Sequence, residues 1–125
     1  MDREPFESEQ QNVLTRSQIS ALPFYGLARG FLTGKYRKGV TVESVRSEGV
    51  IEYQTDRGYA VVDALTDIAQ AHHSTPSAIA LAWLRANPAV STPIASARTV
   101  EQLNEIIEVV HLSETEVKIL NRASA

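Results

Sequence analysis

A glycine-punctuated basic segment between Pro23 and Tyr36 carries the residues best suited to binding an anion. Its glycines allow backbone angles and close approaches to a ligand that other residues avoid, at positions Gly26, Gly30 and Gly34. Arg29 offers a forked guanidinium, Lys35 a compact ammonium, and Thr33 a hydroxyl donor. The pattern predicts a loop that brings backbone N–H groups and cations close to an anion. The alternative is an ordinary surface loop whose cations are solvated.

A second anion-binding pattern lies where a predicted strand is followed by a predicted helix, around Ser96 and Arg98. The unpaired N–H groups and the dipole of a helix N-terminus attract an anion, and an arginine there can hold a phosphate with two hydrogen bonds. Gln102 and Glu105 lie one and two turns further on, near enough to the same face to contact a bound base. The alternative is an ordinary helix start with a solvated arginine.

Two strands and several amphipathic helices must position these patterns. We predict strands over Ile19–Tyr25 and Val90–Ala95, an irregular excursion with one helical turn over Val40–Arg57, and helices over Glu7–Ser17, Tyr59–His73, Ser77–Ala86, Thr99–Val110 and Glu114–Arg122. A strand, a helical crossover and a second strand favour parallel pairing and the α/β class. Both anion-binding patterns then follow the carboxyl end of a strand, where such folds bind ligands, and together they suit a ligand with separated phosphates.

A pair of parallel strands is incomplete as a sheet. Both of its edges remain open, and parallel strands are normally covered on both faces. We therefore expect something outside this sequence to supply the missing cover, by self-association of the chain or by a second chain.

Other chemistries find little support in the residues. The sequence contains no cysteine, which excludes disulfides and thiolate metal sites, and no cluster of carboxylates and histidines has metal-ligand spacing. His72 and His73 end a predicted helix, where the helix dipole favours a cation, and neighbouring residues on a helix point in different directions. We expect no metal site.

The composition of the 125 residues is that of an ordinary globular protein, with 43% hydrophobic and 22% charged residues. The net charge of -3 gives no reason to expect nucleic acid or an acidic membrane as a partner. The acidic, polar first residues differ from a signal peptide, and no apolar run is long enough to span a bilayer. We expect a single domain in the cytoplasm.

Three segments together resemble the aldo-keto reductases, which are NADP-dependent (β/α)8 barrels: PFYGLARGFLTGKYR from Pro23, TPSAIALAWLRANPAV from Thr75 and TPIASARTVEQLNE from Thr92. Their order and spacing make the resemblance more specific than any one of them. It covers nearly the whole sequence and is similar to about the C-terminal two-fifths of such a barrel. The resemblance implies a partial α/β barrel in which the two predicted strands are strands seven and eight.

The resemblance also implies roles in NADP(H) binding for eleven residues. Phe24 matches the aromatic residue that stacks on the nicotinamide, and the loop along the pyrophosphate is matched by Tyr25, Leu27, Arg29, Gly30, Thr33 and Lys35. The adenosine end is matched by Ser96 and Arg98 at the 2′-phosphate, which favours NADPH over NADH, and by Gln102 and Glu105 at the adenine.

The family's catalytic Asp, Tyr, Lys and His have no counterpart in this sequence, because they lie on the first four strands of the barrel. The resemblance therefore implies an oxidoreductase segment, truncated relative to the family, that is inactive unless another chain supplies the first part of the barrel. The alternative is a non-catalytic module that binds a dinucleotide or mediates oligomerisation.

Overall fold

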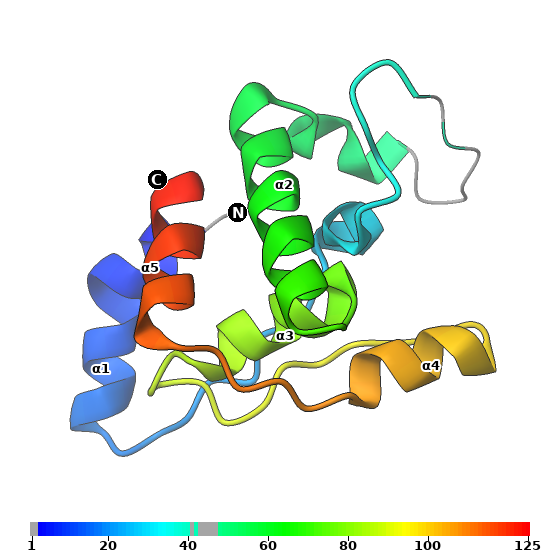
Figure 1. Ribbon diagram of the computed structural model, residues 1–125. Helices are drawn as coiled ribbons and strands as arrows, with labels where there is room; N and C mark the ends of the chain where they lie inside the picture. Colours follow the sequence, from blue (N-terminus) through cyan, green and yellow to red (C-terminus); the bar gives the residue numbers. More distant parts are fainter. Residues whose placement is uncertain (1–2, 41, 43–47) are drawn as a thin grey trace.

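The computed structural model describes residues 3–40, 42 and 48–125, and this part of the chain is built from helices (Figure 1). A short π-helix, η1 (Phe6–Gln10), runs directly into α1 (Gln11–Arg16). The other elements, in chain order, are the 3-10 helices η2 (Ala28–Thr33) and η3 (Glu48–Tyr53), followed by α2 (Asp56–Ala71), α3 (Pro76–Arg85), α4 (Val100–Ile107) and α5 (Glu114–Ala123). Each predicted helix is confirmed, with ends that differ by a few residues.

Side-chain caps explain where the helices begin. The Thr55 hydroxyl accepts a hydrogen bond of 3.0 Å from the N–H of Gly58, so α2 starts earlier than its apolar periodicity predicts. Thr75 caps α3 in the same way, with a proline at the first helical position. Ser113 and Glu116 form a reciprocal capping box at α5, in which the Glu116 carboxylate accepts the Ser113 N–H at 2.7 Å.

The predicted excursion over Val40–Arg57 contains more structure than expected. The segment Glu48–Tyr53 forms η3, and α2 already begins at Asp56. Residues 41 and 43–47 of the predicted excursion lie outside the described residues.

The two predicted strands, Ile19–Tyr25 and Val90–Ala95, do not form in the described part of the chain. They lie side by side and parallel, but only one isolated parallel bridge, between Ala21 and Val90, joins them. Ala21 donates its N–H to the Ala89 carbonyl at 2.7 Å and accepts the Ser91 N–H at 3.0 Å. The direction of the predicted pairing is therefore right and its extent is wrong.

Two prolines explain why the ladder stops after one bridge. In a parallel ladder the next pair of hydrogen bonds would come from the N–H of residue 23 to Ser91 and from the N–H of residue 93 to Pro23. Both donors are missing because residues 23 and 93 are prolines. The Pro23 carbonyl accepts instead from Ile94, one residue further along, at 2.8 Å.

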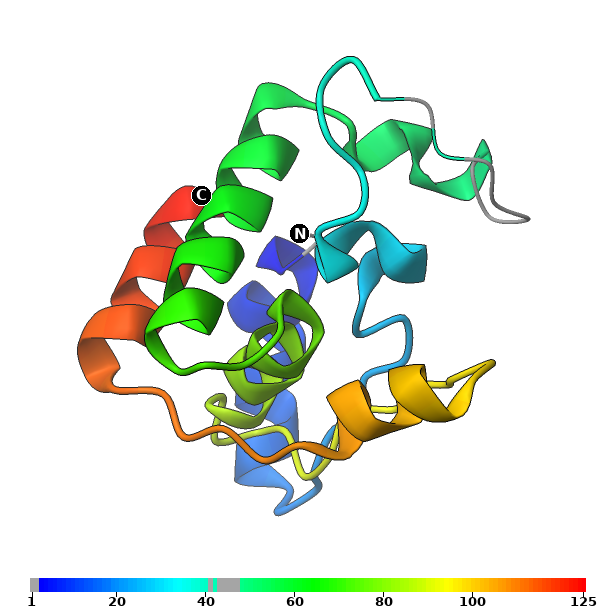
Figure 2. The same cartoon turned by 45° about the vertical axis from the view of Figure 1, so that its right-hand side comes forward.

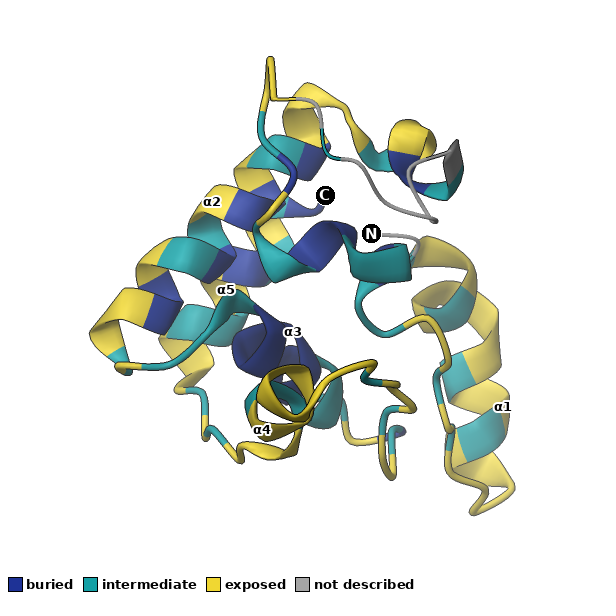
Figure 3. Cartoon of the chain, turned by 90° about the vertical axis from the view of Figure 1, so that its right-hand side faces the viewer, coloured by how far each residue is buried: buried dark blue, intermediate teal, exposed yellow. Residues whose placement is uncertain are grey.

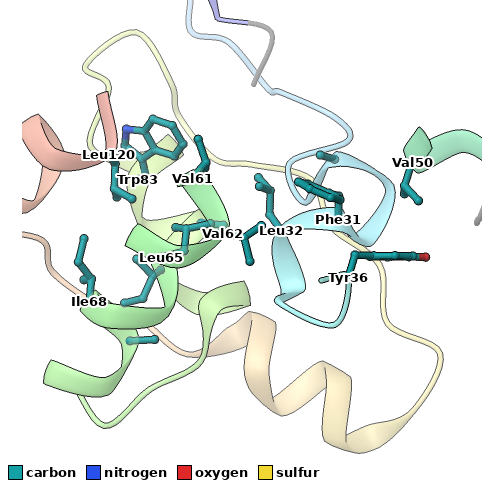
Figure 4. Packing of buried hydrophobic residues seen from close by; sticks show 14 residues of the cluster. Phe31, Leu32, Tyr36, Val50, Val61, Val62, Leu65, Ile68, Trp83 and Leu120 are labelled. Atoms are coloured by element: carbon teal, nitrogen blue, oxygen red, sulfur yellow. The ribbon is translucent and has the colours of Figure 1, made fainter. Parts of the chain in front are cut away.

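The hydrophobic core lies between α2, α3, α5 and η2. Figure 3 shows the buried residues gathered on the facing sides of α2 and α3 and on η2, and Figure 4 shows the side chains from these elements meeting. Phe31 of η2 is fully buried, and its ring centroid lies about 6 Å from those of three tyrosines, Tyr36, Tyr53 and Tyr59. Burial of a side chain of this size contributes about 1.5–3 kcal/mol, so the core holds η2 firmly against α2.

The N-terminal helix is held to the C-terminal helix by polar contacts around one arginine. The Arg3 guanidinium lies 5.1 Å from the Trp83 ring, forms an ion pair of 2.8 Å with Glu7 and donates to the Ser124 hydroxyl. Trp83 in turn donates its indole N–H to the Asn121 side chain at 2.8 Å. These contacts connect η1, α3 and α5.

The helix α4 lies apart from this core. Figure 2 shows α4 and α5 on opposite sides of α3, and none of the residues of α4 is buried. Among the described residues, no helix is long and apolar enough to cross a membrane.

Candidate functional site

The structure brings all eleven predicted site residues to the wall of one open pocket, with a volume of about 600 Å³. Residues 24–35, which include η2, form one wall. Residues 94–106, which follow Val90 in sequence and run into α4, form the other. The residues that come from the first wall are Phe24, Tyr25, Leu27, Arg29, Gly30, Thr33 and Lys35, and those from the second are Ser96, Arg98, Gln102 and Glu105. Two segments about seventy residues apart in sequence thus meet at the end of the parallel bridge.

The backbone of the first wall adopts left-handed conformations at five residues. Tyr25, Ala28 and Arg29 have φ values of 57°, 47° and 57°, and Gly30 and Gly34 have φ values of 95° and 83°. Each non-glycine residue in this region costs about 1–2 kcal/mol, so the packing of Phe31 and its neighbours must hold the loop in place. The N–H groups of Ala28, Gly30 and Leu32 donate to the Tyr25 and Leu27 carbonyls within the loop, so the anion-binding capacity of this wall lies in its cations and in the remaining N–H groups.

Three cations line the pocket without an ion pair to any described carboxylate: Arg29, Lys35 and Arg98. The Arg29 guanidinium lies 5.3 Å from the Tyr25 ring and donates to the Gly49 carbonyl at 3.4 Å, which fixes its position and leaves other N–H groups available. Among the residues that the structure describes, Glu105 is the one carboxylate in the pocket wall. A cation-rich pocket in a chain of net charge -3 is suited to an anionic ligand.

The second wall includes the N-terminus of α4. Thr99 caps this helix by accepting the Gln102 N–H at 3.3 Å. The Gln102 side-chain carbonyl accepts the Arg98 N–H at 3.0 Å, instead of the Thr99 N–H that a capping box would use. Hydrogen bonds from its own backbone N–H and from Thr99 lower the pKa of Glu101, which keeps that carboxylate charged at the helix start.

Sequence reasoning missed one polar residue of the pocket, Ser77. Its side chain is almost completely buried, and its hydroxyl donates to the Glu105 carboxylate at 3.1 Å. The bond ties α4 to the first turn of α3 and sets the position of Glu105 in the pocket wall. The signal in the sequence was weak, since a serine after Thr75-Pro76 reads simply as part of a helix start.

His72 contacts a carboxylate of another helix. It is the C-cap residue of α2, and its Nε2 atom lies 2.6 Å from the Glu116 carboxylate of α5. In the ranges that the structure describes, no group of three or more potential ligands is placed to hold a metal ion.

The chain is similar to known proteins over nearly all of its length. Residues 6–125 match the family model described as the aldo/keto reductase family. The chain is 32% identical over 114 residues to protein tas of Escherichia coli, and the alignment covers 89% of this chain and 33% of tas. The same match is found with protein tas of Shigella flexneri. The chain thus spans about a third of the length of the curated relatives it matches.

Solved structures give the same result. A thermostable aldo-keto reductase crystallised with the inhibitor epalrestat is 25% identical, with a TM-score of 0.67 over 98% of this chain and 36% of its own. The fold also matches glycerol dehydrogenase of Gluconobacter oxydans, with a TM-score of 0.75, 20% identity, and coverage of 95% of this chain and 38% of that enzyme. Because the family model matches almost the whole sequence, this chain belongs to the aldo/keto reductase family.

Proposed function

We propose that this chain is the NADP(H)-binding segment of an aldo-keto reductase, an oxidoreductase that interconverts carbonyls and alcohols. The observation that carries the proposal is the pocket with three unpaired cations, a strained left-handed loop and a helix N-terminus around one opening. Each of these features favours phosphate oxygens, and NADP(H) carries phosphates at two separated positions. The segment would form part of an α/β barrel, with the Ala21–Val90 bridge as the remnant of its two strands.

In this proposal each wall of the pocket holds a different part of the cofactor. Phe24, whose side chain is 71% exposed, would stack on the nicotinamide ring. Arg29 and Lys35 would follow the pyrophosphate, together with loop N–H groups that do not already donate within the loop. Arg98 and Ser96 would bind the 2′-phosphate. Gln102 and Glu105, which lie in α4 and line the pocket, would face the adenine.

The chemistry of the reaction divides between the cofactor and the rest of the enzyme. When bound, the cofactor supplies or accepts a hydride at the nicotinamide. This chain's residues bind it and fix its orientation. A proton for the carbonyl oxygen must come from a general acid. None of the four tyrosines matches the family's acid, so we propose that this residue lies outside the segment and that the segment alone does not reduce carbonyls. The absence of cysteine suits the cytoplasm, which we propose as the location.

Calorimetric titration with NADPH and NADH tests the proposal through Arg98. Replacement of Arg98 by alanine removes the proposed 2′-phosphate partner, and we expect NADPH binding to weaken by about 1–3 kcal/mol while NADH binding stays nearly unchanged. Arg57→Ala serves as the matched control, since Arg57 is an exposed arginine in the first turn of α2 outside the pocket. Equal losses for both cofactors in the Arg98 variant would overturn the 2′-phosphate assignment.

A further inference from the structure

The helix α4, which forms part of the pocket wall, contributes nothing to the hydrophobic core. Of its eight residues only Glu105 and Ile106 are half-buried, and the others are exposed. Segments without regular secondary structure flank it on both sides, at residues 92–97 and 108–113. Beyond α4, the next side chain that packs against the core is that of Val110. Burial of apolar surface therefore does little to hold α4 in place.

Two serines at the start of α3 are hydrogen-bonded to one face of α4. The Ser77 hydroxyl donates to the Glu105 carboxylate at 3.1 Å, and the Ser74 hydroxyl donates to the Glu108 carboxylate at 2.8 Å. The two glutamates are three residues apart at the C-terminal end of α4, a spacing that places them on the same side of a helix. The Arg85 side chain, from the last turn of α3, adds a bond of 3.4 Å to the Glu108 carbonyl.

The backbone gives α4 no further attachment. In the part of the chain that the structure describes, no backbone hydrogen bond joins residues 95–109 to the rest of the molecule. The last such bond before α4 runs from the Ile94 N–H to the Pro23 carbonyl. Segments with few core contacts and few hydrogen bonds open locally at a small cost in free energy. The helix can therefore leave α3 as a unit while α2, α3 and α5 stay folded.

We propose that Ser74 and Ser77 are positioning residues, whose two hydrogen bonds form a latch that holds α4 against α3, and that α4 alternates between a latched and an open position. The proposal rests on the proposed function and deepens it, because the latched position sets the pocket wall that contains Arg98, Gln102 and Glu105. In the open position this wall moves away, and the adenosine end of the cofactor can enter or leave. A ligand that contacts both walls binds the latched position better, so cofactor binding and latching favour each other by the same factor.

Distances between two spin labels test the latch without any ligand. The chain contains no cysteine, so Asn104→Cys in α4 and Thr115→Cys in α5 supply the only labelled sites. Both side chains are exposed and lie outside the pocket, on helices that flank α3 on opposite sides (Figure 2). We expect double electron–electron resonance to show a longer second distance once Ser74→Ala and Ser77→Ala are combined in a double variant. The ratio of open to latched molecules should rise about tenfold or more, because each lost bond changes an equilibrium about fivefold.

A buried serine far from α4 provides the matched control. Ser124 is buried like Ser77, and its hydroxyl donates to the Asn121 carbonyl at 3.1 Å. Ser124→Ala should leave the distances unchanged, and Ser74→Ala alone, at a half-buried position, should shift them in the same direction as the double variant. Circular dichroism checks that each variant folds. Equal distance distributions for the double variant and Ser124→Ala would overturn the proposal.

Titrations with both cofactors separate the latch from the cofactor proposal. The double variant should bind NADPH and NADH more weakly by one common factor, set by the fraction of molecules still latched, which is about twofold when half are open. Arg98→Ala, in contrast, should weaken NADPH alone. Saturating NADPH should return the double variant to the shorter distance. Unchanged affinities in a largely open double variant would overturn the positioning role. A chain that binds neither cofactor would overturn the proposed function alone, since the distances measured without ligand still decide the latch.

Discussion

Replacement of Gly58 by alanine tests how the core positions the site loop. Gly58 lies in the first turn of α2, where alanine normally stabilises a helix by about 1 kcal/mol relative to glycine. Here an added Cβ would lie 1.9 Å from the Tyr53 carbonyl oxygen and 3.2 Å from the Phe31 ring. The carbonyl belongs to the backbone of η3, so the two elements must separate by about 1 Å, and overpacking of this kind costs about 1–3 kcal/mol or more.

The clash should outweigh the gain in helix propensity. We expect Gly58→Ala to lower the free energy of unfolding by about 1–3 kcal/mol, which is a loss of about 4 °C in Tm for each kcal/mol in a chain of this size. Urea denaturation and thermal denaturation followed by circular dichroism measure both quantities. Ala60→Gly, at an exposed position of the same helix, reports the propensity effect alone, with an expected loss of about 1 kcal/mol. A Gly58→Ala variant as stable as the wild type would refute the packing argument.

Three further predictions concern single side chains. The Ser113 backbone N–H and hydroxyl lower the pKa of Glu116, so its stabilising charge is present above the ordinary value of 4.5 and is lost as the pH falls through the lowered pKa. Glu116→Gln should therefore reduce stability at pH 7 more than at pH 3, as measured by urea midpoints, and an equal loss at both would contradict this. Ser77→Ala should cost about 1–2 kcal/mol in urea denaturation because Glu105 loses its buried partner, and an unchanged midpoint would show that the bond contributes nothing. Tyr36→Phe should leave stability unchanged or raise it slightly, because the buried Tyr36 hydroxyl has no hydrogen-bond partner among the described residues, whereas a loss above about 1 kcal/mol would reveal one.

The helices could be predicted from the sequence because their signals are local. Apolar residues at helical spacing and the caps at Thr75, Thr99 and Ser113 are all visible in the sequence, and each corresponding helix is confirmed. The start of α2 was predicted too late because the periodicity begins after Gly58, whereas the cap at Thr55 fixes the true start. The element type was therefore easier to predict than its boundary.

Amino-acid composition did not predict how far the two strands pair. Apolar content and length favour strands on both sides of the Ala21–Val90 bridge, and the parallel direction is right. The length of the pairing depends on register, which decides whether Pro23 and Pro93 fall at positions that must donate a hydrogen bond. Register is a tertiary property, so the sequence alone did not determine it.

The meeting of the two anion-binding patterns in one pocket followed from the family resemblance and from the rule that ligands bind at the carboxyl ends of parallel strands. The contact between Ser77 and Glu105 could not be predicted in the same way, because it joins two helices across a crossing that no local pattern specifies. The role of the eleven predicted site residues in NADP(H) binding stays a prediction.

The most direct test of the central claim is a titration of the isotopically labelled chain with NADPH, followed residue by residue by amide chemical shifts in NMR spectra. We predict saturable shifts confined to the two walls of the pocket, around Arg29 and Arg98, with smaller shifts at the adenosine end when NADH replaces NADPH. Absence of saturable shifts, or shifts centred away from the pocket, would contradict the proposal that this chain binds the cofactor.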